Sequence, residues 1–213
     1  SFNPWTALLK HFYSARGYDR RPHKVIDFGR VRELLAVPAH THVGKRNKTI
    51  LAILFGGALR RSEAVGLRIQ DITEEVSGTV LVLRRTKTGE AARQPIPEWC
   101  SAIVYEYLAC RRLEEAKPED PFLVQYAYGR PKSEMDDRTL ARVFNRVLRE
   151  AGLEGYTPHD ARATVITRLR KQGLTYEEIL PFSRHSSVKT VQRYDKLILS
   201  EAGNVAKKLT FNG

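Results

Sequence analysis

The chain has 213 residues, 42% of them hydrophobic and 28% charged, a composition typical of a soluble globular protein with a sizeable core. Its longest nearly apolar run, residues 49–59, is too short to cross a bilayer, so we expect no membrane-spanning segment. A formal net charge of +12 indicates a polyanionic partner, most commonly nucleic acid, and the basic residues are too dispersed to form an amphipathic membrane-binding helix.

The start of the chain predicts a linker rather than a folded element. Residues 1–22 are mixed and basic, with Pro4 and Pro22 as breaks. Because the first residue is Ser1 and the only methionine is Met135, we expect a processed chain or a fragment of a longer protein. The expected organisation is a linker or tail over 1–22 and one main domain over 23–213, whose C-terminal tail begins at about residue 197.

Helical patterns begin after the linker. Residues 27–37 (DFGRVRELLAV) carry apolar side chains at helical spacing, and residues 45–57 (KRNKTILAILFGG) present a wide apolar face that ends at a glycine pair. Between about 68 and 97 the pattern changes to two short extended runs, TVLVLRR and AARQPIP, separated by the turn signal TKTGE. This pattern predicts a β-hairpin with Lys87 at or near its tip.

Helices resume in the second half of the chain. One is predicted over 98–116, and it carries Cys100 and Cys110 roughly 15 Å apart, too far for a disulfide. No metal-ligand spacing involves these thiols, so we expect them to be structural and the compartment to be reducing. That compartment is the cytoplasm, at the nucleoid, for a prokaryotic or phage protein, and the nucleus is the alternative. Residues 138–152 carry an apolar stripe with arginines outside it, and further helices are predicted over 161–173, over 175–182 and around Tyr194. The predicted fold is mainly α with one small antiparallel β-sheet (α+β).

Four short stretches carry the candidate catalytic side chains. They are ALRRSE with Arg60, TKTG with Lys87, HDAR with His159 and Arg162, and RHSS with a tyrosine nine residues after its histidine. Taken singly, each has an ordinary explanation. Arg60 alone is a surface partner of Glu63, a lysine at a turn is solvated, and an HxxR pair often starts a helix. The order and spacing of all four together are what indicate a site.

Together these stretches resemble the tyrosine recombinases, or phage-type integrases, over roughly residues 23–200. ALRRSE resembles their G-L-R-x-S-E box, HDAR their H-x-L-R box, RHSS followed by a tyrosine their G-H-S-S…Y ending, and TKTG their hairpin lysine. There are departures: Arg184 stands where glycine usually precedes the histidine, Ala161 replaces the usual apolar residue, and Ala163 replaces the usual His or Arg. The resemblance implies the catalytic-domain fold of that family.

The resemblance also implies which residues bind the scissile phosphate. A phosphodiester resists attack because its non-bridging oxygens carry negative charge, and guanidinium offers them a planar bidentate fork, so Arg60 and Arg162 are the expected clamp. His159 and His185 are expected to hydrogen-bond the phosphate or to shuttle protons. Glu63 is expected in a supporting role, orienting His159.

Bond breaking is assigned to two further residues. Tyr194 is the expected nucleophile, because a phenol with a pKa near 10 ionises more easily than serine and nearby cations help further. By family analogy its attack links the protein to the DNA 3′ end through a phosphotyrosine. Lys87 is the expected acid that protonates the departing 5′ oxygen. No metal and no other cofactor is expected, because nothing in the sequence supplies the acidic cluster of a two-metal nuclease.

The expected partner is double-stranded DNA, bound by a homo-tetramer on paired sites, with a monomer off DNA and no membrane partner. Residues expected to contact phosphates without reading sequence are basic, namely Lys45, Arg46, Arg84, Arg85, Arg93, Arg138, Arg142 and Arg146. By family analogy a missing N-terminal portion holds a core-binding domain. The leading hypothesis is a recombinase or integrase; the alternatives are a type IB topoisomerase-like enzyme that relaxes DNA and a DNA-binding regulator without activity.

Overall fold

The computed structural model describes residues 23–37, 39–84, 91–192 and 194–195. Its helices and strands, with one 3-10 turn (η1), follow one another along the chain as α2 (Phe28–Ala36), α3 (His42–Gly56), α4 (Arg61–Val65), η1 (Ile69–Asp71), β1 (Ile72–Glu75), β2 (Gly78–Leu83), β3 (Ala92–Pro95), α5 (Glu98–Leu113), β4 (Val124–Ala127), β5 (Arg130–Glu134), α6 (Asp137–Glu150), α7 (Pro158–Lys171), α8 (Tyr176–Ser183) and α9 (Val188–Gln192).

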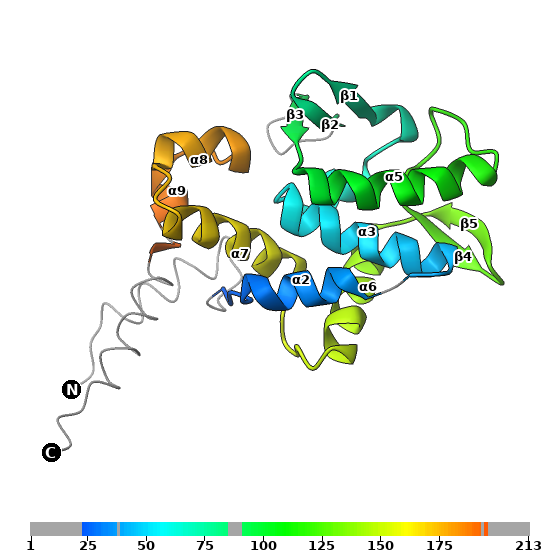
Figure 1. Ribbon diagram of the computed structural model, residues 1–213, viewed down its shortest axis with the longest axis horizontal. Coiled ribbons are helices and arrows are strands. Elements are labelled where there is room, and N and C mark those ends of the chain that lie inside the picture. The colour runs from blue at the N-terminus through cyan, green and yellow to red at the C-terminus, as the bar shows by residue number, and fades with distance from the viewer. Residues whose placement is uncertain (1–22, 38, 85–90, 193, 196–213) are drawn as a thin grey trace, which may run out of the picture.

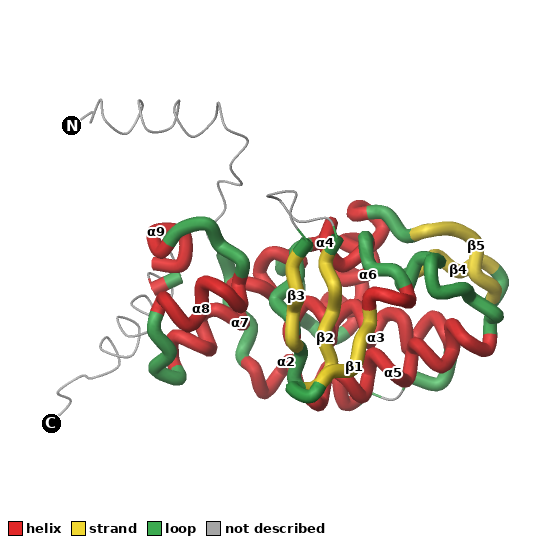
Figure 2. The backbone as a smooth tube through the Cα atoms, turned by 90° about the horizontal axis from the view of Figure 1, so that it is seen from above, coloured by secondary structure: helices red, strands yellow, loops and turns green. Residues whose placement is uncertain are grey.

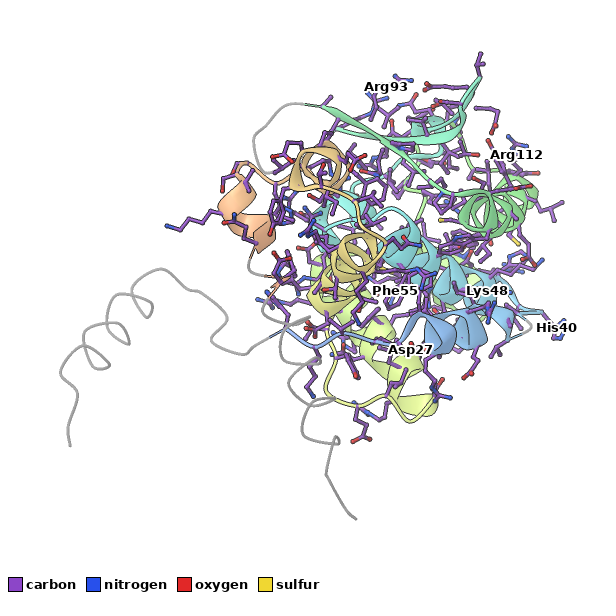
Figure 3. All side chains as sticks on the ribbon, turned by 60° about the vertical axis from the view of Figure 1, so that its left-hand side comes forward. Asp27, His40, Lys48, Phe55, Arg93 and Arg112 are labelled. Carbon is purple, nitrogen blue, oxygen red and sulfur yellow. The ribbon has the colours of Figure 1, made fainter. Side chains whose placement is uncertain are left out.

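Helix α3 lies at the centre of the molecule. Every residue from Thr49 to Gly56 is buried, because the run is apolar on all sides and such a helix is stable only when other elements surround it. Figure 1 shows α5 alongside α3, with the three-stranded sheet beyond α5 and with α2 and α6 on the opposite side of α3. Phe55 of α3 lies in this interior, whereas Arg93 of β3 projects at the outer edge (Figure 3).

The predicted hairpin is present as β2 and β3, which pair antiparallel with Val80 opposite Pro95 and Leu83 opposite Ala92. Lys87 and Arg85 fall between the two strands in sequence and lie outside the described residues. A third strand, β1, pairs with the other edge of β2 and was not predicted. Its sequence, ITEE, is short and rich in charge, so its side chains give no strand pattern. The segment is a strand because its backbone pairs with that of β2.

A second sheet was also missed by the sequence analysis. Strands β4 and β5 form a two-stranded antiparallel ribbon at one end of the molecule, with a register shift between Gln125 and Tyr126 (Figure 2). All five residues of β5 are exposed, and the segment includes Pro131. An exposed strand of this kind shows no alternation of apolar and polar residues, which is the signal that a sequence offers.

The predicted helices are confirmed with shifted ends, except that the last one, α9, ends at Gln192 and does not include Tyr194. Helix α6 buries its predicted stripe at Leu140, Val143, Phe144 and Leu148 against the core, and the predicted mainly α fold is confirmed. Cys100 and Cys110 are free and buried, and burial raises the pKa of the Cys100 thiol, in keeping with a structural thiol.

Two hydrophobic clusters divide the interior. The larger one gathers residues of α2 to α6 with the three-stranded sheet, whereas a smaller one joins α7, α8 and α9 around Ile166, Ile179 and Val191. Figure 2 shows α7, α8 and α9 together at one end of the molecule. No helix in the described part of the chain is long and apolar enough to cross a membrane.

Candidate active site

Arg60 stands at the start of α4 and is held there by Glu63. The backbone N–H of Arg60 donates to Glu63 Oε2 at 2.7 Å, and Arg60 Nη1 donates to Glu63 Oε1 at 2.5 Å. This is a capping arrangement in which an acidic side chain in the first turn satisfies an N–H that the helix leaves free. The Glu63 side chain is fully buried, so its charge needs such partners.

The second partner of Glu63 is Arg184 and not His159. Arg184 Nη2 donates to Glu63 Oε2 at 2.8 Å, so cations occupy both carboxylate oxygens. Burial opposes ionisation of Glu63, but Arg184 and then Arg60 outweigh it and lower its pKa. The expectation that Glu63 orients His159 is therefore corrected: Glu63 orients the two arginines.

Arg162 projects from α7 into the interior and is 1% exposed. Its Nη1 donates to the carbonyl oxygen of Ala58 at 2.6 Å, and its Nη2 lies 3.5 Å from His185 Nε2. Its Nε is buried and has no hydrogen-bond partner among the residues that the structure describes. Burial, followed by the charges of Arg60 and Arg184, lowers the pKa of Arg162 to about 9, so the side chain stays cationic at neutral pH.

The start of α7 explains how HDAR is presented. Thr157 and Asp160 form a capping box and Pro158 occupies the first turn, where its missing N–H costs nothing. Asp160 is fully buried and also accepts from the backbone N–H of Lys24 at 2.9 Å. Burial opposes its ionisation, but hydrogen bonds from His23, Lys24 and Thr157 hold its pKa well below the ordinary value. Residues 23 and 24 are thereby fastened to α7.

His23 is a site residue that the sequence analysis missed. Its ring lies 4.5 Å from the ring of His159, edge to face, and 5.8 Å from the ring of Tyr194, stacked. Its Nδ1 is 3.8 Å from Asp160 Oδ1. No motif marks His23, because it reaches the site only through the docking of residues 23–26 along α7, including the bond from Ile26 N–H to Thr164 Oγ1 at 3.0 Å.

His185 is neutral in this environment. Burial, with the charges of Arg162 and Arg60, lowers its pKa to about 3. Its Nδ1 lies 2.8 Å from Ser183 Oγ, and Ser183 Oγ lies 3.4 Å from the carbonyl oxygen of Leu180. Because the guanidinium of Arg162 has only donors, His185 Nε2 is the acceptor in that contact. The ring proton is therefore on Nδ1, and this N–H donates a hydrogen bond to Ser183 Oγ. His185 Nε2 thus presents its lone pair to the guanidinium of Arg162.

Tyr194 is buried at 3% exposure, although its neighbours in sequence are charged. Its apolar contacts come from other elements: Ala163 and Ile166 of α7, Ile179 of α8 and Val191 of α9. It lies just beyond α9, with its N–H donating to the carbonyl oxygen of Val191 at 3.0 Å, rather than inside the helix predicted around it. The ring lies 6.0 Å from that of His185. When ionised, the phenolate of Tyr194 favours the charged form of Arg162.

The structure thus brings together Arg60, Arg162, His185 and Tyr194 from separate segments, with His159 at the exposed start of α7. Three guanidinium groups face one carboxylate, which leaves a local excess of positive charge next to a phenol. Such a cluster is suited to bind a phosphodiester and to stabilise charge that develops on it. No group of three or more His, Cys, Asp or Glu that could hold a metal occurs within the described ranges.

The basic residues expected to contact DNA fall into different classes. Arg138, Arg142 and Arg146 are exposed at four-residue intervals on one face of α6, and Arg146 is 3.9 Å from Glu150. Arg84 pairs with Asp71 at 2.5 Å and Arg93 pairs with Glu75, and both arginines remain more than half exposed. Lys45 is less exposed and pairs with Glu106 of α5 at 3.3 Å.

The expectation that Arg46 contacts DNA phosphates does not fit its position in the structure. Arg46 is 5% exposed, with Nε and Nη2 donating to Asn47 Oδ1 at 3.0 and 2.8 Å and Nη1 donating to the carbonyl oxygen of Val124 at 2.9 Å. Its guanidinium also lies over the ring of Tyr126. Its hydrogen-bonding capacity is used inside the protein, joining α3 to β4, so Arg46 is a structural residue and not a phosphate contact.

The chain is similar to known proteins over most of its length. The model of the phage integrase family matches residues 24–198. The chain is 28% identical over 178 residues to tyrosine recombinase XerA of Thermococcus kodakarensis, covering 84% of this chain and 60% of that protein. It is 34% identical over 174 residues to tyrosine recombinase Synpcc7942_B2651 of Synechococcus elongatus, covering 78% of this chain and 52% of that protein. The chain therefore spans about half to three-fifths of the length of these curated relatives.

Solved structures share the fold. A crystal structure of XerA recombinase superposes with a TM-score of 0.67 at 24% identity, covering 88% of this chain and 68% of that one. XerH recombinase in a post-cleavage complex with a palindromic difH substrate gives a TM-score of 0.66 at 21% identity, covering 90% of this chain and 56% of that one. The fold expected from the sequence is thereby confirmed.

Proposed function

This chain belongs to the phage integrase family, and from that premise we propose that it is the catalytic domain of a site-specific DNA recombinase. The proposed reaction cleaves and rejoins DNA through a covalent 3′-phosphotyrosine intermediate. The observation that carries the proposal is the convergence of Arg60, Arg162, His185 and Tyr194, which come from three stretches far apart in sequence because His185 and Tyr194 share one of them. No feature of the site favours DNA relaxation without strand exchange, or a regulator without chemistry, over this proposal.

Phosphate binding is assigned to Arg162 and Arg60. Arg162 has a buried Nε without a partner in the described part of the chain, and Arg60 is the more exposed of the pair, with 24% of its side chain accessible. Both are held in place by protein acceptors before DNA arrives, so little reorganisation is needed when charge develops in the transition state. The structure therefore supports a preorganised clamp for the two non-bridging oxygens.

Cleavage then follows from Tyr194. Its phenolic oxygen bonds to phosphorus while the bond from phosphorus to the 5′ oxygen breaks. The phenolic proton passes to an imidazole, for which His185 and the exposed His159 are the candidates. The negative charge of the bound phosphate counters the arginine charges that help to lower the pKa of His185. Lys87, which lies outside the described residues, supplies a proton to the departing oxygen. Reversal by a 5′ hydroxyl from another strand rejoins the DNA without ATP.

The partners follow from the proposed reaction. Double-stranded DNA is the proposed substrate, with phosphate contacts from the exposed arginines of α6, from Arg84 and Arg93 and from Arg85, which is outside the described part. Exchange between two duplexes needs four cleavages, so we propose a tetramer on paired sites and a monomer off DNA. Residues 1–22 and the C-terminal tail from about 197 also lie outside the described residues, and the assignment of 1–22 as a linker remains a proposal.

The experiment that tests this function is covalent trapping. The chain is incubated with nicked suicide substrates drawn from its native genomic flanks, on which the cleaved strand diffuses away and the adduct accumulates. We expect a protein–DNA adduct whose peptide maps to Tyr194, and none with Tyr194→Phe despite unchanged DNA binding. An adduct that persists in Tyr194→Phe, or that maps to Tyr105, Tyr107 or Tyr156, contradicts the assignment.

A further inference from the structure

Arg184 occupies a backbone position that suits glycine. It ends α8 with φ 52° and ψ 41°, in the left-handed region that L-residues other than glycine adopt only at a cost. This is the position at which the family resembled by this sequence usually carries glycine, directly before the histidine that corresponds to His185. An arginine that accepts a strained backbone needs compensation from its side chain. That side chain is 10% exposed, which for arginine requires an internal set of partners.

The side chain of Arg184 bonds to the residues that hold the proposed phosphate-binding arginines, and its backbone bonds to one of these arginines, Arg60. Its Nη2 donates to Glu63 Oε2 at 2.8 Å, while Glu63 Oε1 accepts from Arg60 Nη1 at 2.5 Å. Arg60 Nη2 in turn donates to the carbonyl oxygen of Arg184 at 2.8 Å. The three residues therefore form a closed ring of hydrogen bonds. Arg60 is held at both of its terminal nitrogens, once through Glu63 and once directly by the backbone of Arg184.

The same side chain reaches the second phosphate-binding arginine. Arg184 Nη2 donates to the carbonyl oxygen of Ala58 at 3.2 Å, the oxygen that also accepts from Arg162 Nη1 at 2.6 Å. Ala58 is itself in the left-handed region, with φ 47°, so its carbonyl orientation is set by these two donors against a backbone preference. Arg184 Nη1 completes the set by donating to the carbonyl oxygen of Phe182 at 3.0 Å.

We propose that Arg184 is a positioning residue that fixes the spacing of Arg60 and Arg162 before the scissile phosphate binds. The inference rests on the proposed function and deepens it, because it assigns the setting of the clamp to a residue that departs from the family motif. Its terminal nitrogens donate to the carbonyl oxygens of Phe182 and Ala58 and to Glu63, and we assign it a positioning role without contact to the phosphate. It binds one oxygen of Glu63 and leaves the guanidinium of Arg60 bound to the other.

The charge arrangement gives this role a physical basis. Arg60, Arg162 and Arg184 repel one another at close range, and Arg60 and Arg184 both act to remove the proton from Arg162. Glu63 is the carboxylate that counters them, and it lies between Arg60 and Arg184. Without Arg184, the buried carboxylate of Glu63 has Arg60 as its remaining partner, and we expect Arg60 to turn further toward it and away from the phosphate.

The test compares three substitutions at this position, each assayed with the suicide substrate in single turnover. Arg184→Met removes the charge and keeps the bulk, Arg184→Lys keeps the charge but has one nitrogen for three acceptors, and Arg184→Gly restores the residue usual in the family. Arg130→Met, in exposed β5, is the matched control for loss of one positive charge. DNA affinity and thermal unfolding are measured for every variant.

We expect Arg184→Met to slow adduct formation by about 10-fold or more while changing DNA affinity by less than about 2-fold, because positioning acts in the transition state. Arg184→Lys recovers part of the rate, and Arg184→Gly recovers none. A residue that only supports the fold does not split cleavage from binding in this way. If Arg184→Met fails to fold, the Lys and Gly variants decide whether Arg184 positions the clamp or only supports the fold.

A double-mutant cycle tests the route through Glu63. If Arg184 acts through that carboxylate, Arg184→Met combined with Glu63→Gln is no slower than the slower single variant. Full additivity, or cleavage at the wild-type rate in Arg184→Met, overturns the inference. The proposed function fails separately: a wild-type chain that forms no adduct refutes it and the inference together, whereas an active wild-type chain with equally active Arg184 variants refutes the inference alone.

Discussion

Arg170 donates from Nε to a carboxylate oxygen of Asp195 at 3.2 Å and so ties α7 to the residue directly after Tyr194. The other oxygen of Asp195 accepts from the hydroxyl of Tyr176, whose ring lies under the Arg170 guanidinium at 4.1 Å from the ring centroid. Asp195 thus holds the proposed nucleophile against α7 and α8 within the same chain.

The first prediction concerns this anchor. Asp195→Asn keeps the shape of the side chain but removes the charge that Arg170 pairs with, so we expect adduct formation to fall roughly 10-fold through loss of orientation. Stability falls by about 1 kcal/mol or less, because Arg170 and Asp195 are partly exposed. The rate is measured by suicide-substrate trapping and the stability by urea unfolding.

The matched control is Glu177→Gln, an exposed carboxylate on α8 that undergoes the same chemical change. Adduct formation at the wild-type rate in Asp195→Asn contradicts the role of the anchor.

The second prediction concerns Arg162, where activity and stability are linked. Arg162→Ala removes a phosphate ligand and leaves the carbonyl oxygen of Ala58 with Arg184 as its remaining side-chain donor. We expect cleavage to fall by about 100-fold or more. The melting temperature also falls, because the substitution opens a cavity at a fully buried site, partly offset by the loss of repulsion from Arg60 and Arg184.

Arg162→Lys separates the two effects. It fills most of the space and keeps the charge, so stability recovers more than activity does, because a single ammonium cannot replace the guanidinium fork. Calorimetry and single-turnover trapping measure the pair. Equal recovery of stability and cleavage is the result that argues against a phosphate-binding fork.

The third prediction is a pH dependence of stability that comes from His185. Its folded pKa of about 3 is below its ordinary value, so the unfolded chain binds the proton more readily. The stability contribution is therefore complete above the unfolded value, near pH 6.5, and is lost as the pH falls from there toward 3. We expect wild-type protein to lose more stability between pH 6.5 and 4 than His185→Gln does.

Urea unfolding at a series of pH values in both proteins measures the difference. Asp160 also has a lowered pKa, but its contribution is lost below the unfolded value of an aspartate, about pH 3.9, which lies below this window. Parallel stability curves for the two proteins between pH 6.5 and 4 disprove the assignment to His185.

The fourth prediction concerns Lys87, whose role rests on the family resemblance. A general acid becomes dispensable when the leaving group needs no proton, so Lys87→Ala is expected to be slow on ordinary DNA and to recover on a 5′-phosphorothiolate substrate. Comparing the two single-turnover rates measures the recovery, with wild-type protein on both substrates as the control. Equal impairment on both substrates makes Lys87 a binding residue instead.

The sequence by itself determined the family, the order of the motifs and the mainly α character. Periodic apolar side chains mark buried helix faces such as that of α6, and the hairpin around Lys87 follows from β-branched runs with a turn signal between them. These signals are local, so one sequence suffices to detect them. Strands β1 and β5 were missed because their pairing satisfies backbone groups and leaves no side-chain pattern.

The tertiary structure alone decided the partners of the charged residues. Buried charges must find hydrogen-bonding partners wherever the fold brings them, and those partners are far apart in sequence. Glu63 therefore pairs with Arg184 instead of His159, and Arg46 is used to join α3 to β4 instead of binding DNA. His23 likewise reaches His159 across 136 positions of sequence because Asp160 captures the backbone next to it.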